Sequence, residues 1–426
     1  MNLEFEFIQV AMGLREQLSA APSVNEWQTL FEFCKRQSLL GIGFAAVEKL
    51  HKVGVECPST IRLQWYGYAL KIERMNEKLN MQCDEISKRY EHDGLQCCIL
   101  KGQGNLLNYP EILRMRRTPG DIDLWAIQIN DEGLRIKDEG IDYVEYHGRR
   151  AVREYVRMQY RIQGIDAKQY RIQGIDAKPK ACYHHIEAPS MDGTEVEVHY
   201  RPAFLRSPLR NRRMQQWFEH HAEECMNNKT HLGFSMMTSS VNVVYQMCHL
   251  FTHIFEGGIG LRQLMDYYFA LRVWHNDVME CKDLQSQGMW SEGLDMPVMS
   301  KEEVMAVLRS LGMAKFAGAV MYVLHEVFAI PTQLSMNDER SRMKDYPWLL
   351  CEPNEKEGKK LLDEIMLGGN FGQYDTRDAA LKKGGMIKHG LWKLKRVMRL
   401  VSSYPEEALW EPVFRVYHLI WRIAHR

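Results

Sequence analysis

Apolar residues recur at helical spacing through the first part of the chain. Between Leu30 and Leu50 they return every three or four positions, and the pattern continues through residues 60–92. This period is typical of helices that bury one face. We therefore predict an N-terminal helical region, without strands, over residues 1–94.

The pattern changes to that of strands from residue 95. The segment CCIL (97–100) is a short apolar run, whereas DIDLWAI (121–127) and TEVEVHYRP (194–202) alternate between polar and apolar residues. A period of two is typical of strands that place one face in a core. Residues 95–205 are therefore predicted to form a mixed unit of strands and helices.

Helical spacing then returns and continues to the end of the chain, which predicts a C-terminal helical domain over residues 206–426. The predicted fold class is thus α+β: a small mixed β-sheet core flanked by N-terminal helices and a large C-terminal helical region. Within the core, the segment QYRIQGIDAK occurs twice in tandem, at residues 159–168 and 169–178. One repetition does not make a solenoid, so we interpret it as a duplication in a surface loop or hairpin.

Charge and cysteine content exclude several classes of protein. Lys+Arg and Asp+Glu both total 55, so no net charge attracts nucleic acid or a membrane to the whole chain. The ten cysteines show no CxxC pair, which favours reduced, buried thiols over disulfides or a zinc site. The acidic start and the lack of a long apolar run predict neither a signal peptide nor a membrane span, and we expect a cytoplasmic protein.

Two aspartates lie in one of the predicted strands. In the segment GDIDLW, Asp121 and Asp123 are two positions apart, so their side chains share one face, about 7 Å apart along the strand. Aspartate is a poor strand former, and two carboxylates this close repel each other unless a cation lies between them. Mg²⁺ prefers carboxylate oxygens. We therefore predict that Asp121 and Asp123 bind catalytic Mg²⁺, with Mn²⁺ as the alternative ion.

A glycine turn precedes this strand. Lys101, Gly102, Gln103 and Gly104 follow the apolar run CCIL and precede the start of a helix. Backbone N–H groups in such a turn can approach a phosphate, and a lysine can add a point charge. We predict nucleotide binding at Lys101, Gly102 and Gln103, although the segment is not a P-loop because it lacks the GxxxxGK[ST] pattern.

The predicted strand TEVEVHYRP offers a further carboxylate. By alternation Glu195, Glu197 and His199 share one of its faces. If this strand neighbours the aspartate strand, either glutamate can be the third acid, and the register with His199 favours Glu197. Three such carboxylates would form a two-metal site, in which one ion activates an attacking hydroxyl and the other binds the triphosphate.

Four segments resemble a known family: LKGQGNLLNYP, RRTPGDIDLWA, EVEVHYRP and FEGGIGLRQLMDY. They are similar to an uncharacterised nucleotidyltransferase family common in Bacteroidetes, within the DNA polymerase β superfamily. The resemblance spans roughly residues 95–270 and, more loosely, 271–426. It implies that Gly102 lies in the nucleotide-binding turn, that Asp121 and Asp123 are metal ligands and that Glu197 is the third ligand. The chain departs from many superfamily members in having Gly-Gln rather than Gly-Ser or Gly-Gly at the turn.

Residues outside these motifs give weaker signals. Arg117, just before the aspartate strand, is the arginine that we expect to contact phosphate. His199, His253 and Arg262 are candidates for the substrate side of the site. The stretch 382–426 carries ten Lys or Arg and three Glu. We interpret it as closing the helical domain with its charges solvated, rather than as an element that binds a membrane or nucleic acid.

Together these features predict a metal-dependent nucleotidyltransferase. It would move a nucleoside monophosphate from a nucleoside triphosphate to an acceptor and release pyrophosphate, using two Mg²⁺ ions held by Asp121, Asp123 and Glu197. The alternatives are an inactive nucleotide- or ligand-binding regulatory protein on the same fold, and an RNA-directed nucleotidyltransferase. Zero net charge disfavours a nucleic-acid partner, and the sequence identifies neither the acceptor nor the nucleotide.

Overall fold

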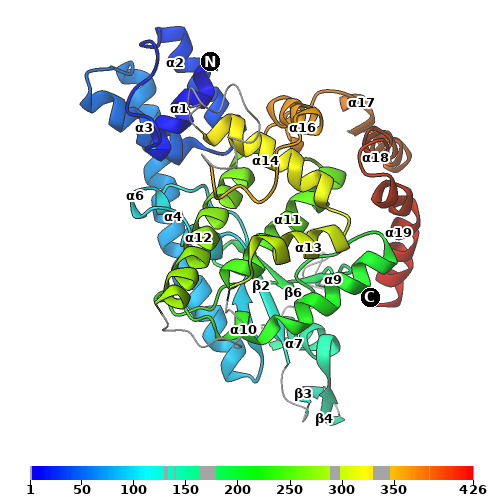
Figure 1. Cartoon of the computed structure of the whole chain (residues 1–426). Coiled ribbons are helices and arrows are strands. Elements are labelled where there is room, and N and C mark those ends of the chain that lie inside the picture. Colours follow the sequence, from blue (N-terminus) through cyan, green and yellow to red (C-terminus); the bar gives the residue numbers. More distant parts are fainter. Residues whose placement is uncertain are drawn as a thin grey trace. The chain divides into compact units, whose positions relative to one another are not determined.

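The chain folds into two compact units, which we call the helical unit and the sheet unit (Figure 1). The computed structural model describes residues 2–128, 133–138, 141–162, 179–287, 298–329, 346–382 and 384–425. The helical unit comprises Met1–Met75, Leu106–Thr118 and Asn242–Leu409, and the sheet unit comprises Asn76–Asn105, Pro119–Val241 and Trp410–Arg426. Each unit is therefore assembled from segments that are distant in sequence, and each combines parts of all three predicted regions.

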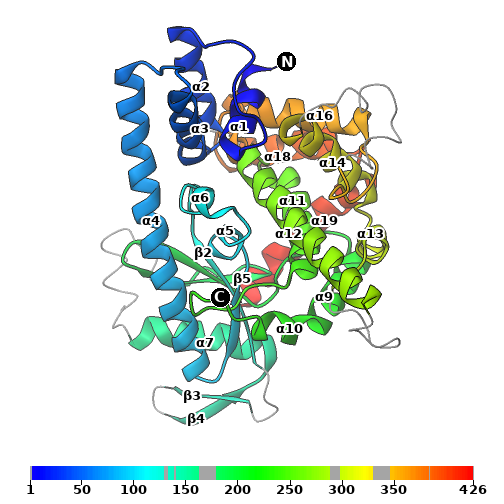
Figure 2. The ribbon, with the colours of Figure 1, turned by 60° about the vertical axis from the view of Figure 1, so that its left-hand side comes forward.

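Four helices form the N-terminal region, as the apolar spacing predicts. They are α1 (Leu3–Met12), α2 (Val24–Arg36), α3 (Leu40–Lys52) and the long α4 (Ser59–His92), which Figure 2 shows as one continuous helix. Ser23 and Glu26 form a capping box that starts α2. The rings of Phe7 and Phe31 pack against Trp65 with centroids 5.5 and 5.3 Å away, so the apolar faces of α1, α2 and α4 meet in one core.

A four-stranded sheet forms the centre of the sheet unit. Its strands are β1 (Gln96–Ile99), β2 (Ile122–Ile127), β5 (His185–Met191) and β6 (Thr194–His199), in the order β1-β2-β6-β5. The pair β2–β6 is parallel and the other two pairs are antiparallel, so the sheet is mixed. A separate two-stranded sheet pairs β3 (Leu134–Asp138) with β4 (Ile141–Tyr146). The predicted α+β class, with a small mixed sheet among helices, is confirmed.

Short and amphipathic helices accompany the sheet in this unit. They are α7 (Gly148–Ile162), α9 (Pro208–His220) and α10 (Ala222–Asn227), while α5 (Gln103–Leu106) follows β1 directly. Helix α7 packs against β5 and β2 and buries Val152 and Val156. Residues 159–162 of the tandem repeat lie in α7, and residues 163–178 fall outside the described part of the chain. The interpretation of the repeat as a surface duplication stays a prediction.

The rest of the helical unit continues the predicted C-terminal helices. The short α6 (Glu111–Arg114) belongs to this unit but precedes the predicted C-terminal region. The others are, in chain order, α11 (Ser239–Glu256), α12 (Leu261–Ser286), α13 (Lys301–Ser310), α14 (Ala314–Phe328), α16 (Glu355–Gly368), the 3₁₀ turn η1 (Asn370–Gly372), α17 (Ala379–Lys382) and α18 (Met386–Leu400). Helix α19 (Pro405–Ala424) begins in this unit, and its residues from Trp410 onward belong to the sheet unit. Helix α14 buries nearly all of its side chains. Phe251 and Phe316 pack with Tyr404 at ring separations of 5.2 and 5.8 Å, so segments on either side of α14 share its core.

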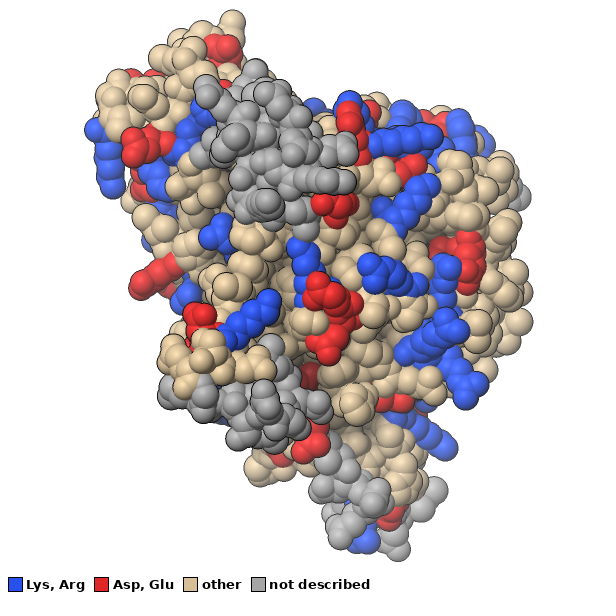
Figure 3. Space-filling model, viewed as in Figure 1, with Lys and Arg blue, Asp and Glu red and all other residues tan. Residues whose placement is uncertain are grey.

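Surface and cysteines agree with the composition. Basic and acidic side chains are interspersed on the face shown in Figure 3, as expected for a chain with formal net charge +0. All ten cysteines are free thiols, eight of them are buried, and Cys182 and Cys351 are half-buried. Within the described ranges, every helix is too short or too polar to cross a membrane.

Candidate active site

The two aspartates lie where β2 begins, in the middle of the four-stranded sheet. Asp121 immediately precedes the strand and its side chain is 35% exposed. Asp123 is the second residue of β2 and its side chain is fully buried. β2 has neighbours on both edges, so hydrogen bonds on both sides fix the backbone that carries these acids.

Glu197 joins the aspartates because of the parallel pairing of β2 with β6. The register places Glu197 directly opposite Asp123. Carboxylate oxygens of Asp121, Asp123 and Glu197 all lie within 4.8 Å of one another. Glu195 lies two residues earlier on β6, is exposed and is not part of this group. Of the two glutamates left open by the sequence, the structure therefore brings Glu197 to the aspartates.

Two basic side chains contact the acidic group. The Nζ atom of Lys101 lies 3.0 Å from Oδ1 of Asp123 and 3.9 Å from Oδ2 of Asp121. The Nε2 atom of His199 lies 3.0 Å from the same Oδ1 of Asp123 and 3.5 Å from Oε2 of Glu197. Lys101 and His199 thus partly neutralise three carboxylates that would otherwise repel one another.

The pKa values in this cluster reflect competition between burial and charge. Burial disfavours the imidazolium, but hydrogen bonds with Asp123 and Glu197 raise the pKa of His199 to about 9. Burial opposes ionisation of Glu197, yet its hydrogen bond with His199 and the nearby His185 lower its pKa to about 2. Burial also disfavours the charge on Lys101, while Asp123 and Asp121 raise its pKa. Lys101, Glu197 and His199 are therefore charged at neutral pH.

One buried carboxylate oxygen remains open. Among the described residues, no group donates a hydrogen bond to Oδ2 of Asp123, although this atom is shielded from solvent. A buried carboxylate oxygen without a partner is costly, and a divalent cation would satisfy it. Three carboxylates with oxygens within 4.8 Å are the hard donor set that Mg²⁺ and Mn²⁺ take. The residues present thus fit a divalent cation.

The glycine turn is built by close backbone contacts. Gly102 has a φ of +60°, and a Cβ atom on Gly104 would lie 2.7 Å from the carbonyl oxygen of Ile99. The backbone N–H of Leu100 donates to the carbonyl of Asp123 at 3.0 Å, which ties the turn to β2. This geometry places Lys101 beside the aspartates, and it requires glycine at 102 and 104.

The side chain of Gln103 has a structural role. It is buried, and its Nε2 donates to the carbonyl of Asn76 at 3.3 Å and to Oδ1 of Asn80 at 2.7 Å, both on α4. The side chain of Gln103 therefore has protein partners, and a contact of Gln103 with nucleotide would be made by its backbone. A local pattern contains no signal for this structural role, because the contact between the turn and α4 is a tertiary one.

A pair of histidines at the start of β5 extends the cluster. The hairpin register places His185 opposite His199, and Nδ1 of His185 lies 3.4 Å from Oε2 of Glu197. Burial and the charge of His199 lower the pKa of His185 to about 4. His184 lies behind it, with its Nε2 3.0 Å from Nδ1 of His185. His185, Glu197 and His199 form a second group whose possible ligand atoms lie within 4.8 Å of one another.

His185 was not among the residues predicted for the site. Only the pairing of β5 with β6 shows that His185 and Glu197 meet. The alternating pattern of the two strands was the available signal, but alternation does not fix register.

The remaining predicted residues belong to the helical unit. Arg117 is buried, and its Nε and Nη2 donate to the two carboxylate oxygens of Asp266 at 2.7 and 2.8 Å. Nη1 of Arg262 donates to the carbonyl of Thr118 at 3.0 Å, and Nδ1 of His253 lies 3.5 Å from a carboxylate oxygen of Glu256. The structure thus gives these three side chains protein partners, and their roles toward nucleotide or substrate stay predictions.

Comparison with known proteins gives one match. Residues 23–288 match the family model described as uncharacterised nucleotidyltransferase. The matched range contains the glycine turn, both aspartates, Glu197 and His199, and it ends before α13. Neither the curated proteins nor the solved structures contain a significant match.

Proposed function

The chain belongs to the uncharacterised nucleotidyltransferase family, and from this premise we propose that it transfers a nucleoside monophosphate from a nucleoside triphosphate. An acceptor hydroxyl would attack the α-phosphorus, the bond to the β-phosphate would break, and pyrophosphate would leave. The observation that carries this proposal is that carboxylate oxygens of Asp121, Asp123 and Glu197 lie within 4.8 Å of one another, while Asp123 keeps a buried oxygen that has no partner among the described residues.

We propose Asp121, Asp123 and Glu197 as the ligands of Mg²⁺. When bound, the metal would supply Lewis-acid stabilisation of the charge on the phosphate oxygens. Because the pKa of Glu197 is about 2, this side chain suits a ligand that stays ionised rather than a group that accepts a proton. A second ion would draw its other ligands from the triphosphate, as Mg²⁺ in nucleotide sites commonly does.

The other residues of the cluster would orient these ligands. Lys101 and His199 both contact Oδ1 of Asp123, so they hold the carboxylate with Oδ2 directed away from them. His185 would hold Glu197 in the same way. Such supporting contacts fix the orientation of metal ligands. The backbone of the turn at Gly102 would then approach the phosphates beside them.

The test is transfer of label from nucleoside triphosphates that carry it on the α-phosphate. Purified protein with Mg²⁺ is incubated with each of the four ribonucleotides and an extract of acceptors, and pyrophosphate release is measured in parallel. We expect Asp123→Asn and Glu197→Gln to lower transfer at least about 100-fold, because each removes a charged ligand. Glu195→Gln is the matched control and should retain transfer, because Glu195 is exposed on the same strand.

Two outcomes would contradict the proposal. Undiminished transfer by Asp123→Asn would mean that the carboxylate cluster is not the site of reaction. Metal-dependent binding of nucleotide by calorimetry, with no labelled product from any extract, would instead favour the inactive regulatory protein.

A further inference from the structure

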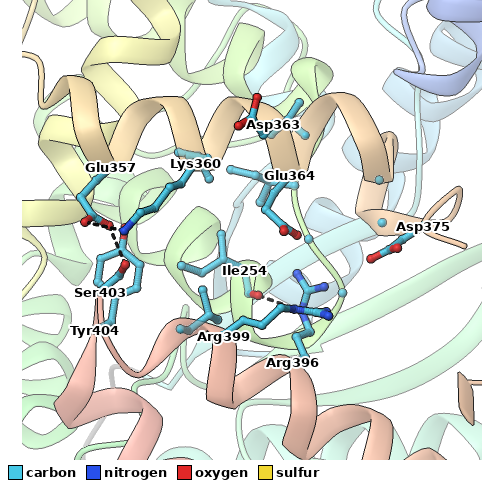
Figure 4. A pocket seen from close by; sticks show the side chains of 18 residues that line it. Ile254, Glu357, Lys360, Asp363, Glu364, Asp375, Arg396, Arg399, Ser403 and Tyr404 are labelled. Atoms are coloured by element: carbon cyan, nitrogen blue, oxygen red, sulfur yellow. Dashed lines mark hydrogen bonds and ion pairs between the residues drawn. The ribbon is translucent and has the colours of Figure 1, made fainter. Parts of the chain in front are cut away.

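A pocket lies entirely within the helical unit. It has a volume of about 290 Å³ and is formed by the loop after α11, by α16, by the loop after η1 and by α18 with the turn that follows it (Figure 4). Most of its lining comes from residues 357–404, beyond the range matched by the family model. Its volume is close to the lower end of the range found for small-molecule sites.

Arg396 is the distinctive residue of this pocket. It is only 7% exposed, and its Nε donates to the carbonyl of Ile254 at 3.0 Å. Figure 4 shows its guanidinium group near the middle of the pocket. Within the part of the chain that the structure describes, its two terminal nitrogens donate no hydrogen bond and meet no carboxylate at ion-pair distance. Arg396 is thus a buried cation whose terminal donors face a cavity.

Four carboxylates line the pocket, and three of them, Glu357, Glu364 and Asp375, are paired with other cations, whereas Asp363 is the fourth. Glu364 and Asp375 both accept hydrogen bonds from Arg377, at 2.6 and 2.9 Å. Glu357 accepts from Ser403 at 2.6 Å and from Lys360 at 3.1 Å. Glu364 and Asp375 therefore offset the burial of Arg396 only by longer-range electrostatic attraction, without a direct ion pair.

The other two cations of the wall differ from Arg396. Lys360 pairs with Glu357 at 3.1 Å, and Nη1 of Arg399 donates to Asp378 at 3.4 Å. Burial lowers the pKa of Arg396, and the charge of the neighbouring Arg399 lowers it further. A buried cation with unused donors is expensive, and an anionic ligand would offset that cost.

A glycine keeps the space beside Arg396 open. Gly258 has a φ of +124°, and a Cβ atom there would lie 3.4 Å from Nη2 of Arg396. That atom would also lie 3.3 Å from the backbone nitrogen of Gly372. At Gly258 the wall beside Nη2 of Arg396 is therefore backbone, and a side chain there would take up the space next to this nitrogen.

The rest of the wall is largely apolar. Ile259, Leu361, Ile365 and Leu400 line it, together with the ring of Tyr404. Tyr404 is 9% exposed, and its hydroxyl makes no hydrogen bond with any described residue. One cation with free donors, one phenol and an apolar wall match a small organic molecule with a single anionic group.

We propose that this pocket binds a small organic anion whose carboxylate or phosphate group pairs with the terminal nitrogens of Arg396. The apolar body of the ligand lies against Leu361 and Leu400, and the hydroxyl of Tyr404 supplies a further hydrogen bond. This site lies in the helical unit and is separate from the carboxylate cluster of the sheet unit. It does not depend on the proposed transfer reaction.

Binding is tested on the full-length protein by calorimetry and thermal denaturation at constant ionic strength. The probes are benzoate and phenyl phosphate, with benzamide as an uncharged analogue of benzoate. We expect at least one anion to release heat and raise the melting temperature, whereas benzamide does neither. A preference between the two anions shows whether the pocket takes a carboxylate or a phosphate.

Substitutions then locate the binding. Arg396→Gln should weaken binding of the anion at least about tenfold, because hydrogen bonds to a charged group are worth roughly 1.5–3 kcal/mol. Arg399→Gln is the matched control, since Arg399 lines the same pocket but pairs with Asp378, and it should change binding less than about threefold. Should Arg396→Gln fail to fold, Arg396→Lys decides, because it keeps the charge and loses the planar fork.

The proposal is overturned if neither anion binds, if benzamide binds as well as benzoate, or if the decisive Arg396 variant binds as the wild type does. It is supported if binding is lost at Arg396 and retained at Arg399.

Discussion

At the scale of single residues, the charge on Lys101 substitutes for part of what a metal would supply. Its Nζ lies 3.0 Å from a buried carboxylate oxygen of Asp123. We predict that Lys101→Met lowers stability in the absence of metal, because three carboxylates then share only the positive charge of His199. Added Mg²⁺ should restore more stability in this variant than in the wild type.

Thermal denaturation with and without Mg²⁺ measures this difference. Lys88→Met is the control, because Lys88 forms an exposed i,i+4 ion pair with Asp84 in the same unit and should contribute little. An equal Mg²⁺ response in wild type and Lys101→Met would show that Lys101 and the metal do not share Asp123.

Arg117 has its main partner on a helix that is distant in sequence. In sequence it precedes the aspartate strand, yet its guanidinium forms two hydrogen bonds with Asp266, and Asp266 also accepts from the hydroxyl of Tyr109 at 2.7 Å. Asp266→Asn should cost about 3–5 kcal/mol of the free energy of unfolding, because it leaves a buried arginine unpaired. Urea denaturation measures this cost. A decrease in the free energy of unfolding of less than about 1 kcal/mol would mean that the pair is as weak as a surface ion pair and would contradict the prediction.

At the scale of elements, replacing glycine by alanine at positions 67 and 104 should have opposite effects on stability. A Cβ atom on Gly104 would lie 2.7 Å from the carbonyl of Ile99, so Gly104→Ala should destabilise the turn by about 1–3 kcal/mol. Gly67 lies on α4 with nothing within 4 Å of its Cβ position, so Gly67→Ala should stabilise the helix by about 0.5–1 kcal/mol. Denaturant melts of both variants test the pair, and the same sign for both would refute the steric argument.

The cluster of Arg377 with Glu364 and Asp375 predicts a dependence of stability on pH. Burial opposes their ionisation, but hydrogen bonds from Arg377 lower the pKa of both carboxyls below the ordinary values of 4.5 and 3.8. The contribution of these two carboxylates to folding stability is therefore complete above those pH values and is lost as the pH falls below them. Arg377→Met should be less stable than the wild type at pH 7, and the difference should shrink toward pH 3. A difference independent of pH would contradict this.

Sequence patterns predicted the elements of the site better than their pairing. The alternation in DIDLWAI and TEVEVHYRP identified β2 and β6, since a strand with one buried face has a period of two. The register between strands decides that Glu197 rather than Glu195 meets Asp123. Register also decides that His185 faces Glu197. Register is set by contacts between distant segments, which a local pattern does not contain.

At the scale of the whole molecule, the chain builds its two units from interleaved segments. Residues Leu106–Thr118 leave the sheet unit between the glycine turn and β2 and join the helical unit, where Arg117 meets Asp266. The three consecutive regions predicted from the spacing of apolar residues reflect where helical and strand periods change. Periodicity reports the local conformation of a segment, whereas the grouping into units depends on which apolar faces pack together.

This interleaving gives the final prediction, on hydrogen exchange. If Mg²⁺ binds the carboxylate cluster, its binding energy should protect amides of the cooperative region that holds Asp121, Asp123 and Glu197. Saturating Mg²⁺ should slow exchange in β1, β2 and β6 and leave α12–α14 of the helical unit unchanged, and Asp123→Asn should abolish the effect. Mass spectrometry of peptides from both units measures this. Equal protection of the two units would mean that the metal stabilises the chain through sites beyond the cluster.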